Sequence, residues 1–165
     1  IPGPCAAITA LVSSGLPSSK FTFEGFLPKK QSERGKILLE ISRNEKTSII
    51  FESPHRLIKL LYELKEYCGG DRQIRVSREL TKKFEQHIGD NIYEVINFFN
   101  DREVLGEITV VIEGRNKSKN NTPSDNFQIK RDLNDLTTAG LSLSAASKYL
   151  AKKNNIPKSI IYNMY

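Results

Sequence analysis

Residues 47 to 67 join a short strand directly to an amphipathic helix, and this junction restricts the chain to folds that alternate strands with helices. Thr47 to Phe51 is a run of β-branched and aromatic residues, which is typical of a buried strand. Ser53 and Pro54 then form a common helix opening, with serine as the N-cap and proline at the first helical position. Four leucines follow at the spacing that buries one face of a helix: Leu57, Leu60, Leu61 and Leu64.

Three ionisable residues lie at this junction. Glu52, His55 and Arg56 stand between the end of the strand and the first turn of the helix, where we expect them to be exposed. In an open α/β sheet, ligands bind at the carboxyl ends of strands, so we expect chemistry here. A capped helix with a solvated first turn explains the same residues equally well.

A second strand, predicted at residues 73–82, also ends in charged residues. Arg78, Glu79 and Lys82 lie at its far end, and Arg34 belongs to a basic group at the entrance of the helix predicted at 32–44. Two strands that both end in ionisable residues favour a shared rim over two unrelated solvated turns. We therefore expect these side chains to border one ligand site.

The hydrophobic periodicity over the first 114 residues predicts a mixed-sheet αβα sandwich, of class α/β. The predicted elements are, in order, a helix at 5–12, a strand at 21–28, a helix at 32–44, a strand at 47–51, a helix at 54–67, a strand at 73–82, a short strand at 85–88, a helix capped by Asp90 and reaching Phe99, and a central strand at 106–112.

The composition fits a single core with a small additional unit. The chain has 165 residues, of which 38% are hydrophobic. No apolar run approaches the roughly 20 residues of a membrane span, and nothing resembles a signal peptide. Cys5 and Cys68 make no metal-binding pattern, so we expect no metal and two free thiols. Because the chain starts at Ile1 within a structural motif, we expect that an upstream part is missing.

The last third of the chain differs in pattern and in charge. Residues 115–125 contain no large apolar side chain, which predicts a flexible linker. Beyond it, residues 126–165 (the tail) show only helical periodicity, at 127–139, 142–152 and 157–165. The last two helices have helix-turn-helix length and pattern. The predicted core positions are Leu143, Ala146, Leu150, Ile156, Ile161 and Tyr162, and the predicted outward-facing cations are Lys148, Lys152, Lys153 and Lys158.

The charge distribution suggests a polyanionic partner for the tail. Residues 1–114 hold 16 Lys and Arg against 16 Asp and Glu, whereas residues 115–165 hold 9 against 3, an excess of 6 that equals the whole net charge of +6. A basic segment attached to a neutral body is typical of nucleic-acid contact. A three-helix bundle with no nucleic-acid role fits the same pattern equally well.

Five motifs in order resemble the bacterial small-subunit ribosomal RNA methyltransferase I family. The motifs are Ile1-Pro2-Gly3-Pro4-Cys5-Ala6, Gly25-Phe26-Leu27-Pro28, Phe51-Glu52-Ser53-Pro54-His55-Arg56, Arg78-Glu79-Leu80-Thr81-Lys82, and Gly106-Glu107 with Ile112-Glu113-Gly114. Members of this family are S-adenosylmethionine-dependent cytidine 2′-O-methyltransferases of the tetrapyrrole-methylase fold. The resemblance covers residues 1–114 as the second of two α/β domains, and residues 136–165 of the tail are similar to the C-terminal helix-turn-helix piece of the family.

The resemblance implies a cofactor edge and an RNA partner. The cofactor-binding residues that it implies are Pro4, Cys5, Ala6, Phe51, Leu80, Gly106, Glu107 and Ile108. The partner would be 16S ribosomal RNA or the small ribosomal subunit, the enzyme would be a cytoplasmic homodimer without a membrane segment, and the absent first domain would complete the cofactor site.

Methyl transfer to a ribose hydroxyl is an in-line displacement, so alignment of the reactants supplies much of the acceleration. Glu52, His55 and Glu79 are candidates for a base, and we favour RNA positioning for His55 and Arg56. Arg34, Arg78 and Lys82 would hold phosphates. Two other functions remain open: methylation of a tetrapyrrole-like small molecule, and nucleic-acid binding without catalysis.

Overall fold

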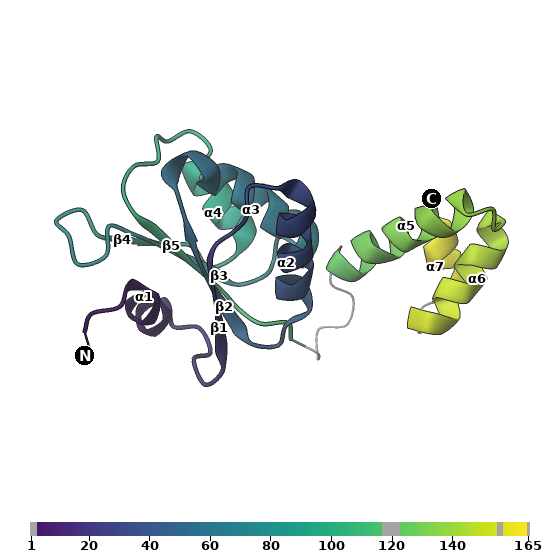
Figure 1. Ribbon diagram of the computed structural model, residues 1–165, viewed down its shortest axis with the longest axis horizontal. Helices are drawn as coiled ribbons and strands as arrows, with labels where there is room; N and C mark the ends of the chain where they lie inside the picture. The colour runs from purple at the N-terminus through teal and green to yellow at the C-terminus, as the bar shows by residue number, and fades with distance from the viewer. Residues whose placement is uncertain (1–2, 117–122, 155–156, 165) are drawn as a thin grey trace. The chain divides into compact units, whose positions relative to one another are not determined.

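The computed structural model describes residues 3–116, 123–154 and 157–164 (Figure 1). The chain divides into two compact units, residues 1–119 and residues 120–165, and each unit is described by itself. Within the described parts of the chain, no helix is both long enough and apolar enough to cross a membrane.

The first unit is built on one five-stranded mixed sheet in the order β1-β2-β5-β3-β4. The strands are β1 (Phe21–Phe26), β2 (Thr47–Glu52), β3 (Ile74–Arg78), β4 (Gln86–Ile88) and β5 (Ile108–Ile112). β1 and β2 are parallel, and β5 is antiparallel to both β2 and β3. The ends of β1, β2 and β3 therefore meet the beginning of β5 at one edge, which we call the rim. Here Glu52 and Arg78 both lie opposite Ile108.

Helices cover both faces of the sheet, which confirms the predicted sandwich (Figure 1). α1 (Ala6–Ser14) packs on one face, where Ala10, Ile49 and Val111 belong to one buried apolar cluster. On the other face lie α2 (Gln31–Arg43), α3 (Pro54–Cys68) and α4 (Ile92–Phe99). Their larger cluster includes the four leucines of α3 that the periodicity identified. As predicted, β5 is apolar and central, and all its residues are buried.

Two predicted helix starts differ in detail. Ser53 is the N-cap of α3 and Pro54 follows it, but the serine side chain makes no capping hydrogen bond. α4 is capped by Asn91 rather than by Asp90. The Asn91 side chain accepts a hydrogen bond from the Glu94 N–H at 3.0 Å, whereas the Asp90 carboxylate pairs with Arg75 at 2.9 Å. Both residues are good caps, and the ion pair takes Asp90 for another contact.

The second unit is a small helical bundle of α5 (Pro123–Thr138), α6 (Leu143–Asn154) and α7 (Lys158–Tyr162). Its core contains Ile129, Leu133, Ala146, Leu150 and Ile161. α5 begins within the predicted linker because a proline suits the first turn of a helix. The rest of that prediction, at residues 117–122, lies outside the described residues, as does the predicted core residue Ile156.

One predicted core position in this unit is wrong. Tyr162 ends the short helix α7 and is 46% exposed. The helix is five residues long, and its buried side is occupied by Ile161. The helix-turn-helix assignment of these helices stays a prediction.

Candidate active site at the rim

A pocket of about 420 Å³ opens at the rim, beside the N-terminal end of α1. Its walls come from residues that are distant in sequence: Ala6, Phe26, Phe51, Glu52, Ser53, Pro54, Gly106, Glu107, Ile108 and Thr109. The antiparallel position of β5 explains this convergence, because the residues before β5 are brought beside those that follow β1 and β2. The pocket lies at the edge where the sequence predicted a ligand site.

Most of the expected cofactor residues line this pocket. Ala6, Phe51, Gly106, Glu107 and Ile108 are all part of its wall. Three others are not among its lining residues. Pro4 and Cys5 are exposed just before α1, and Leu80 packs against the apolar cluster beneath α1.

Four lining residues were not predicted as site residues: Phe26, Ser53, Pro54 and Thr109. Phe26 belongs to one of the motifs that carried the family resemblance, and Ser53 and Pro54 belong to another, so the motifs contained a usable signal. Thr109 follows Ile108 in β5, and only the strand pairing shows that it reaches the pocket.

Aromatic rings form one wall of the pocket. The ring of Phe51 makes edge-on contacts with Phe23, at a centroid distance of 5.0 Å, and with Phe26, at 5.8 Å. Phe26 is 64% exposed, so this wall faces solvent as well as the pocket. Edge-on aromatic pairs are favourable beyond simple burial, and they hold the Phe51 ring in one orientation.

Glu52 is buried, so the prediction that it is exposed at the lip is wrong. It continues the alternation of β2 on the side of α2 and α3, where Ile50 is also buried. Its Oε1 accepts a hydrogen bond from the Ser53 N–H at 2.9 Å and lies 3.3 Å from Arg56 Nε. Its Oε2 lies 3.4 Å from Arg34 Nη2. Both carboxylate oxygens are therefore engaged within the protein.

Arg34 is also buried, with 1% of its surface exposed, so the prediction that it holds an RNA phosphate is wrong. Its Nε donates to the Glu63 carboxylate at 2.6 Å, and its terminal nitrogens reach Glu52. A buried arginine with two carboxylate partners links α2, α3 and the end of β2. This ion cluster supports the floor of the pocket from below.

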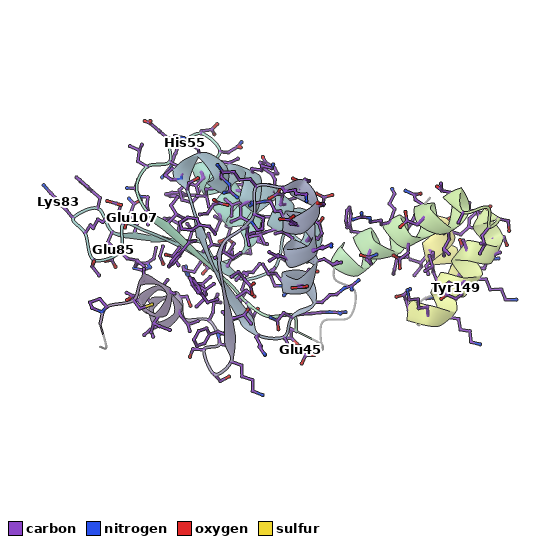
Figure 2. All side chains as sticks on the ribbon, in the orientation of Figure 1. Glu45, His55, Lys83, Glu85, Glu107 and Tyr149 are labelled. Atoms are coloured by element: carbon purple, nitrogen blue, oxygen red, sulfur yellow. The ribbon has the colours of Figure 1, made fainter. Side chains whose placement is uncertain are left out.

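His55 and Arg56, in the first turn of α3, have different surroundings. Arg56 donates a hydrogen bond to the Leu27 carbonyl at 2.8 Å and pairs with Glu52, so its guanidinium connects α3 to the segment after β1. His55 is exposed, and its side chain projects from the end of α3 (Figure 2). Of the two, only His55 is freely accessible to a large partner.

Glu79, Lys82 and Glu107 form a second ion cluster at the rim. Glu79 Oε1 accepts hydrogen bonds from the Glu107 N–H at 2.8 Å and from Lys82 Nζ at 3.0 Å. Lys82 Nζ also lies 3.1 Å from the Glu107 carboxylate. The hydrogen bond from Glu107 and then the one from Lys82 hold the pKa of Glu79 below its usual range. The two carboxylates raise the pKa of Lys82. Glu79 and Lys82 therefore stay charged at neutral pH.

The loop that carries this cluster has a strained backbone. Glu79 and Thr81 have positive φ angles of 53° and 66°, which are unusual for residues with a Cβ and most unusual for a β-branched one. Such conformations cost about 1–3 kcal/mol each and occur often at functional sites. The Glu85 carboxylate holds the loop by accepting from the Thr81 N–H at 2.6 Å. Hydrogen bonds from His87 and from Thr81 lower the pKa of Glu85.

A second hollow, of about 250 Å³, lies next to the pocket. Arg78, Glu79, Phe84, Leu105 and Gly106 line it, and Gly106 belongs to both walls. The Arg78 Nε is buried and has no hydrogen-bond partner among the described residues. A buried donor without a partner costs about 1–3 kcal/mol, so a ligand that accepts from it would be favoured.

The four predicted cations of the tail are all exposed. Lys153 Nζ lies 3.4 Å from Asp132, and Lys158 Nζ donates to the Ser144 hydroxyl at 2.8 Å. Lys148 and Lys152 lie on α6, on either side of the exposed Tyr149. Among the described residues, no three His, Cys, Asp or Glu side chains gather in a way that could hold a metal ion.

The α/β fold of the chain is also found in two solved methyltransferases. A solved cobalamin biosynthetic enzyme, cobalt precorrin-4 methyltransferase, superposes with a TM-score of 0.53 at 13% identity, over 68% of this chain and 50% of that one. The methyltransferase CobJ gives a TM-score of 0.52 at 19% identity, over 74% and 52%. At these identities the likeness concerns the fold alone.

The sequence identifies the family. The family model described as Tetrapyrrole (Corrin/Porphyrin) Methylases matches residues 1–96, so the chain belongs to the tetrapyrrole methylase family. Curated relatives named "Ribosomal RNA small subunit methyltransferase I" are similar over nearly the whole chain. The relative from Buchnera aphidicola is 40% identical over 99% of the chain, and those from Synechocystis and Bacillus subtilis are 38% and 36% identical over 99% and 100%. The chain spans 56–58% of the length of these relatives.

Proposed function

We propose that this chain is part of an S-adenosylmethionine-dependent methyltransferase that acts on small-subunit ribosomal RNA and transfers a methyl group to the ribose 2′-oxygen of a cytidine. The pocket at the rim is the observation that carries the proposal, because residues of four separate motifs converge on it. The names of the relatives support the RNA substrate. The basic tail, which a small-molecule substrate would not require, agrees with it.

The pocket residues fit a sulfonium cofactor. The rings of Phe26 and Phe51 offer faces that attract a cation or stack on a base. Gly106 carries no side chain, so a ligand can approach its backbone closely. We assign cofactor contact to the lining residues Ala6, Phe51, Gly106, Glu107 and Ile108. When bound, S-adenosylmethionine supplies an electrophilic methyl group.

The side chains at the rim are better suited to positioning than to proton abstraction. Both oxygens of Glu52 are engaged by arginines and a backbone N–H. The lowered pKa of Glu79 makes it a weak base near neutral pH. His55 is exposed beyond the pocket residues Ser53 and Pro54, where it can contact RNA. We therefore assign the main acceleration to alignment of the reacting groups, and RNA contact to His55, Arg78 and the tail lysines.

Three further properties are part of the proposal. The active enzyme would be a cytoplasmic homodimer, and the part of the relatives that this chain does not cover would supply the remaining cofactor contacts. The two units would act together, the first holding the cofactor and the tail binding RNA. Because both units belong to one chain, RNA bound by the tail would have a raised local concentration at the first unit.

Transfer of a labelled methyl group tests the proposal. The chain, extended at its N-terminus by the uncovered part of the Bacillus subtilis relative, is incubated with methyl-tritiated S-adenosylmethionine and with either 16S ribosomal RNA or small ribosomal subunits. We expect label in RNA, and in an alkali-resistant dinucleotide after alkaline hydrolysis, because a 2′-O-methyl group blocks attack of that oxygen on the adjacent phosphate.

Other results would support another function. Label in a corrin or porphyrin but not in RNA would identify a small-molecule methyltransferase. RNA binding without calorimetric binding of S-adenosylmethionine, by both the chain and its extended form, would identify a nucleic-acid-binding module and overturn the proposal.

A further inference from the structure

Apart from Gly106, the residues that line the second hollow take no part in the cofactor contacts assigned above. Its walls combine an aromatic ring, a cation and a carboxylate, from Phe84, Arg78 and Glu79. Because Gly106 lines both hollows, a molecule bound here would lie next to a molecule bound in the pocket. This adjacency is what a group-transfer reaction requires of an acceptor site.

Phe84 offers a platform for stacking. It is 64% exposed, although it lines the hollow, and it lies in the loop between β3 and β4. Lys83 Nζ lies 5.6 Å from the centre of its ring, and Figure 2 shows the Lys83 side chain extending from this loop into solvent. An accessible aromatic ring beside cations is typical of surfaces on which single-stranded nucleic acid stacks its bases.

Arg78 and Glu79 place a donor and an acceptor beside this platform. Arg78 lines the hollow, and its buried Nε has no partner among the described residues, so a base that enters the hollow would supply the missing acceptor. Glu79 makes its contacts with Glu107 and Lys82 through Oε1, and it remains ionised at neutral pH as an acceptor. Cytosine and adenine present the matching pair, an amino group next to a ring nitrogen that accepts. Uracil and guanine present a carbonyl group next to an N–H, which is the reverse pattern.

We propose that this hollow binds an amino-bearing nucleobase of single-stranded RNA, stacked on Phe84 and read by Arg78 and Glu79. The inference rests on the proposed function and deepens it, because it names the site of the acceptor nucleotide. The base lies in the hollow, and its ribose lies toward the wall at Gly106 that the hollow shares with the pocket.

Fluorescence anisotropy with four short RNAs tests the inference. Each probe is a fluorescein-labelled heptanucleotide of uridines in which the central residue is C, A, G or U, and the protein is the full 165-residue chain. We expect the C or A probe to bind more tightly than the U and G probes. One well-placed pair of base contacts corresponds to a preference of roughly 5- to 140-fold.

Variants separate stacking from general RNA affinity. Phe84→Ala should weaken binding of the preferred probe by roughly 5- to 140-fold and bring all four probes to similar affinities, because stacking on the ring is lost. Phe84→Trp should retain the preference. Tyr62→Ala is the matched control, because Tyr62 is an exposed aromatic residue, 46% accessible, on helix α3. It should leave the affinities unchanged.

The inference fails if Phe84→Ala leaves the base preference intact, or if the wild-type chain prefers U or G or has no preference. The readout is independent of catalysis. A base preference that depends on Phe84, without methyl transfer to RNA by the extended protein, supports the nucleobase site in the hollow and overturns the proposed function. Methyl transfer to RNA, together with a base preference that Phe84→Ala leaves unchanged, supports the proposed function and overturns the nucleobase site in the hollow.

Discussion

Gly106 separates the two hollows at the rim, and no side chain would fit at its position. Its φ angle is 89°, and a Cβ added there would lie 2.5 Å from Glu79 Cγ. Gly106→Ala should therefore lower the free energy of unfolding by about 2–4 kcal/mol, from left-handed backbone strain and overpacking together. Urea denaturation measures the loss.

Gly15→Ala is the control for this change. Gly15 also has a positive φ angle, of 72°, but a Cβ there would meet nothing within 4 Å. The Gly15→Ala variant should lose about 1 kcal/mol of unfolding free energy, from backbone strain alone. Equal losses for the two variants would show that Glu79 moves away from the added methyl group without cost.

The pKa of Glu79 should respond to its lysine partner. Lys82→Met removes one of the three groups that lower this pKa, which are the Glu107 N–H, Lys82 and Arg78, so the titration midpoint of the Glu79 carboxyl should rise toward the ordinary value of about 4.3. It should stay below that value, because the Glu107 N–H remains and is the larger cause. Carbon-13 NMR of the side-chain carboxyl gives the midpoint in both proteins.

The same shift fixes the sign of the pH dependence. The pKa is lower in the folded chain, so the stabilisation from this cluster is fully present above the unfolded pKa and is lost as the pH falls through the folded pKa. In the Lys82→Met variant, stability should depend less on pH in this acidic range. Lys83→Met, a change in the neighbouring lysine, should leave the Glu79 midpoint where it is. A midpoint insensitive to Lys82 would contradict the ion cluster.

Single residues at the rim were the hardest part to predict from sequence. The positions of Glu52 and Arg34 in the sequence were consistent with exposure, because Glu52 follows the predicted strand at 47–51, Arg34 lies in the first turn of the predicted helix at 32–44, and both are charged. Their burial depends on a pairing with Glu63, which is 29 residues from Arg34 in sequence. Sequence spacing shows no such contact between separate helices. Phe84 gave no signal either, since one aromatic residue in a polar loop has no periodicity.

Secondary-structure elements were predicted more reliably. The strand at 47–51 and the helix after it were identified because leucine spacing and the Ser53-Pro54 opening indicate the same helix. β3 ends at Arg78, four residues before the predicted end, because the backbone turns into left-handed conformations at Glu79 and Thr81. Neither residue type favours that conformation, so no propensity rule would have placed the break there.

The buried ion cluster should dominate the stability of the α2–α3 contact. Arg34→Leu leaves the carboxylates of Glu52 and Glu63 buried without this partner, so we expect a loss of about 3–5 kcal/mol in the free energy of unfolding. Lys30→Leu is the control, since its pair with Glu33 is exposed, and should cost about 0–1 kcal/mol. Chemical denaturation at neutral pH compares the two.

A triple variant distinguishes lost charge pairing from lost packing. Arg34→Leu combined with Glu52→Gln and Glu63→Gln removes the unpaired charges as well, so stability should recover in part relative to Arg34→Leu alone. If the triple variant were less stable than the single one, the cost of Arg34→Leu would come from packing, and the ion cluster would contribute little.

At the scale of the whole molecule, the charge excess lies in residues 115–165, which include the tail, while the described pockets lie in the first unit. If the tail binds RNA through its lysines, the affinity for single-stranded RNA should fall with salt at a slope of about 0.7 per neutralised phosphate. Replacing Lys148, Lys152, Lys153 and Lys158 by serine should then reduce that slope by up to about 3. The measurement is RNA affinity by anisotropy from 50 to about 300 mM salt.

The matched control removes the same charge from the first unit. Lys20, Lys36, Arg43 and Lys46 are exposed; Lys20 and Lys46 directly precede β1 and β2, opposite the rim, and Lys36 and Arg43 lie on α2. Replacing these four by serine lowers the net charge equally, so a general effect of charge would change the slope as much as the tail variant does. A smaller change in the control is expected, because specific phosphate contacts, rather than net charge, set the number of released counterions. If the two variants have equal salt slopes, the tail lysines make no more phosphate contacts than the four control residues do. The tail would then act only through the net charge of the chain.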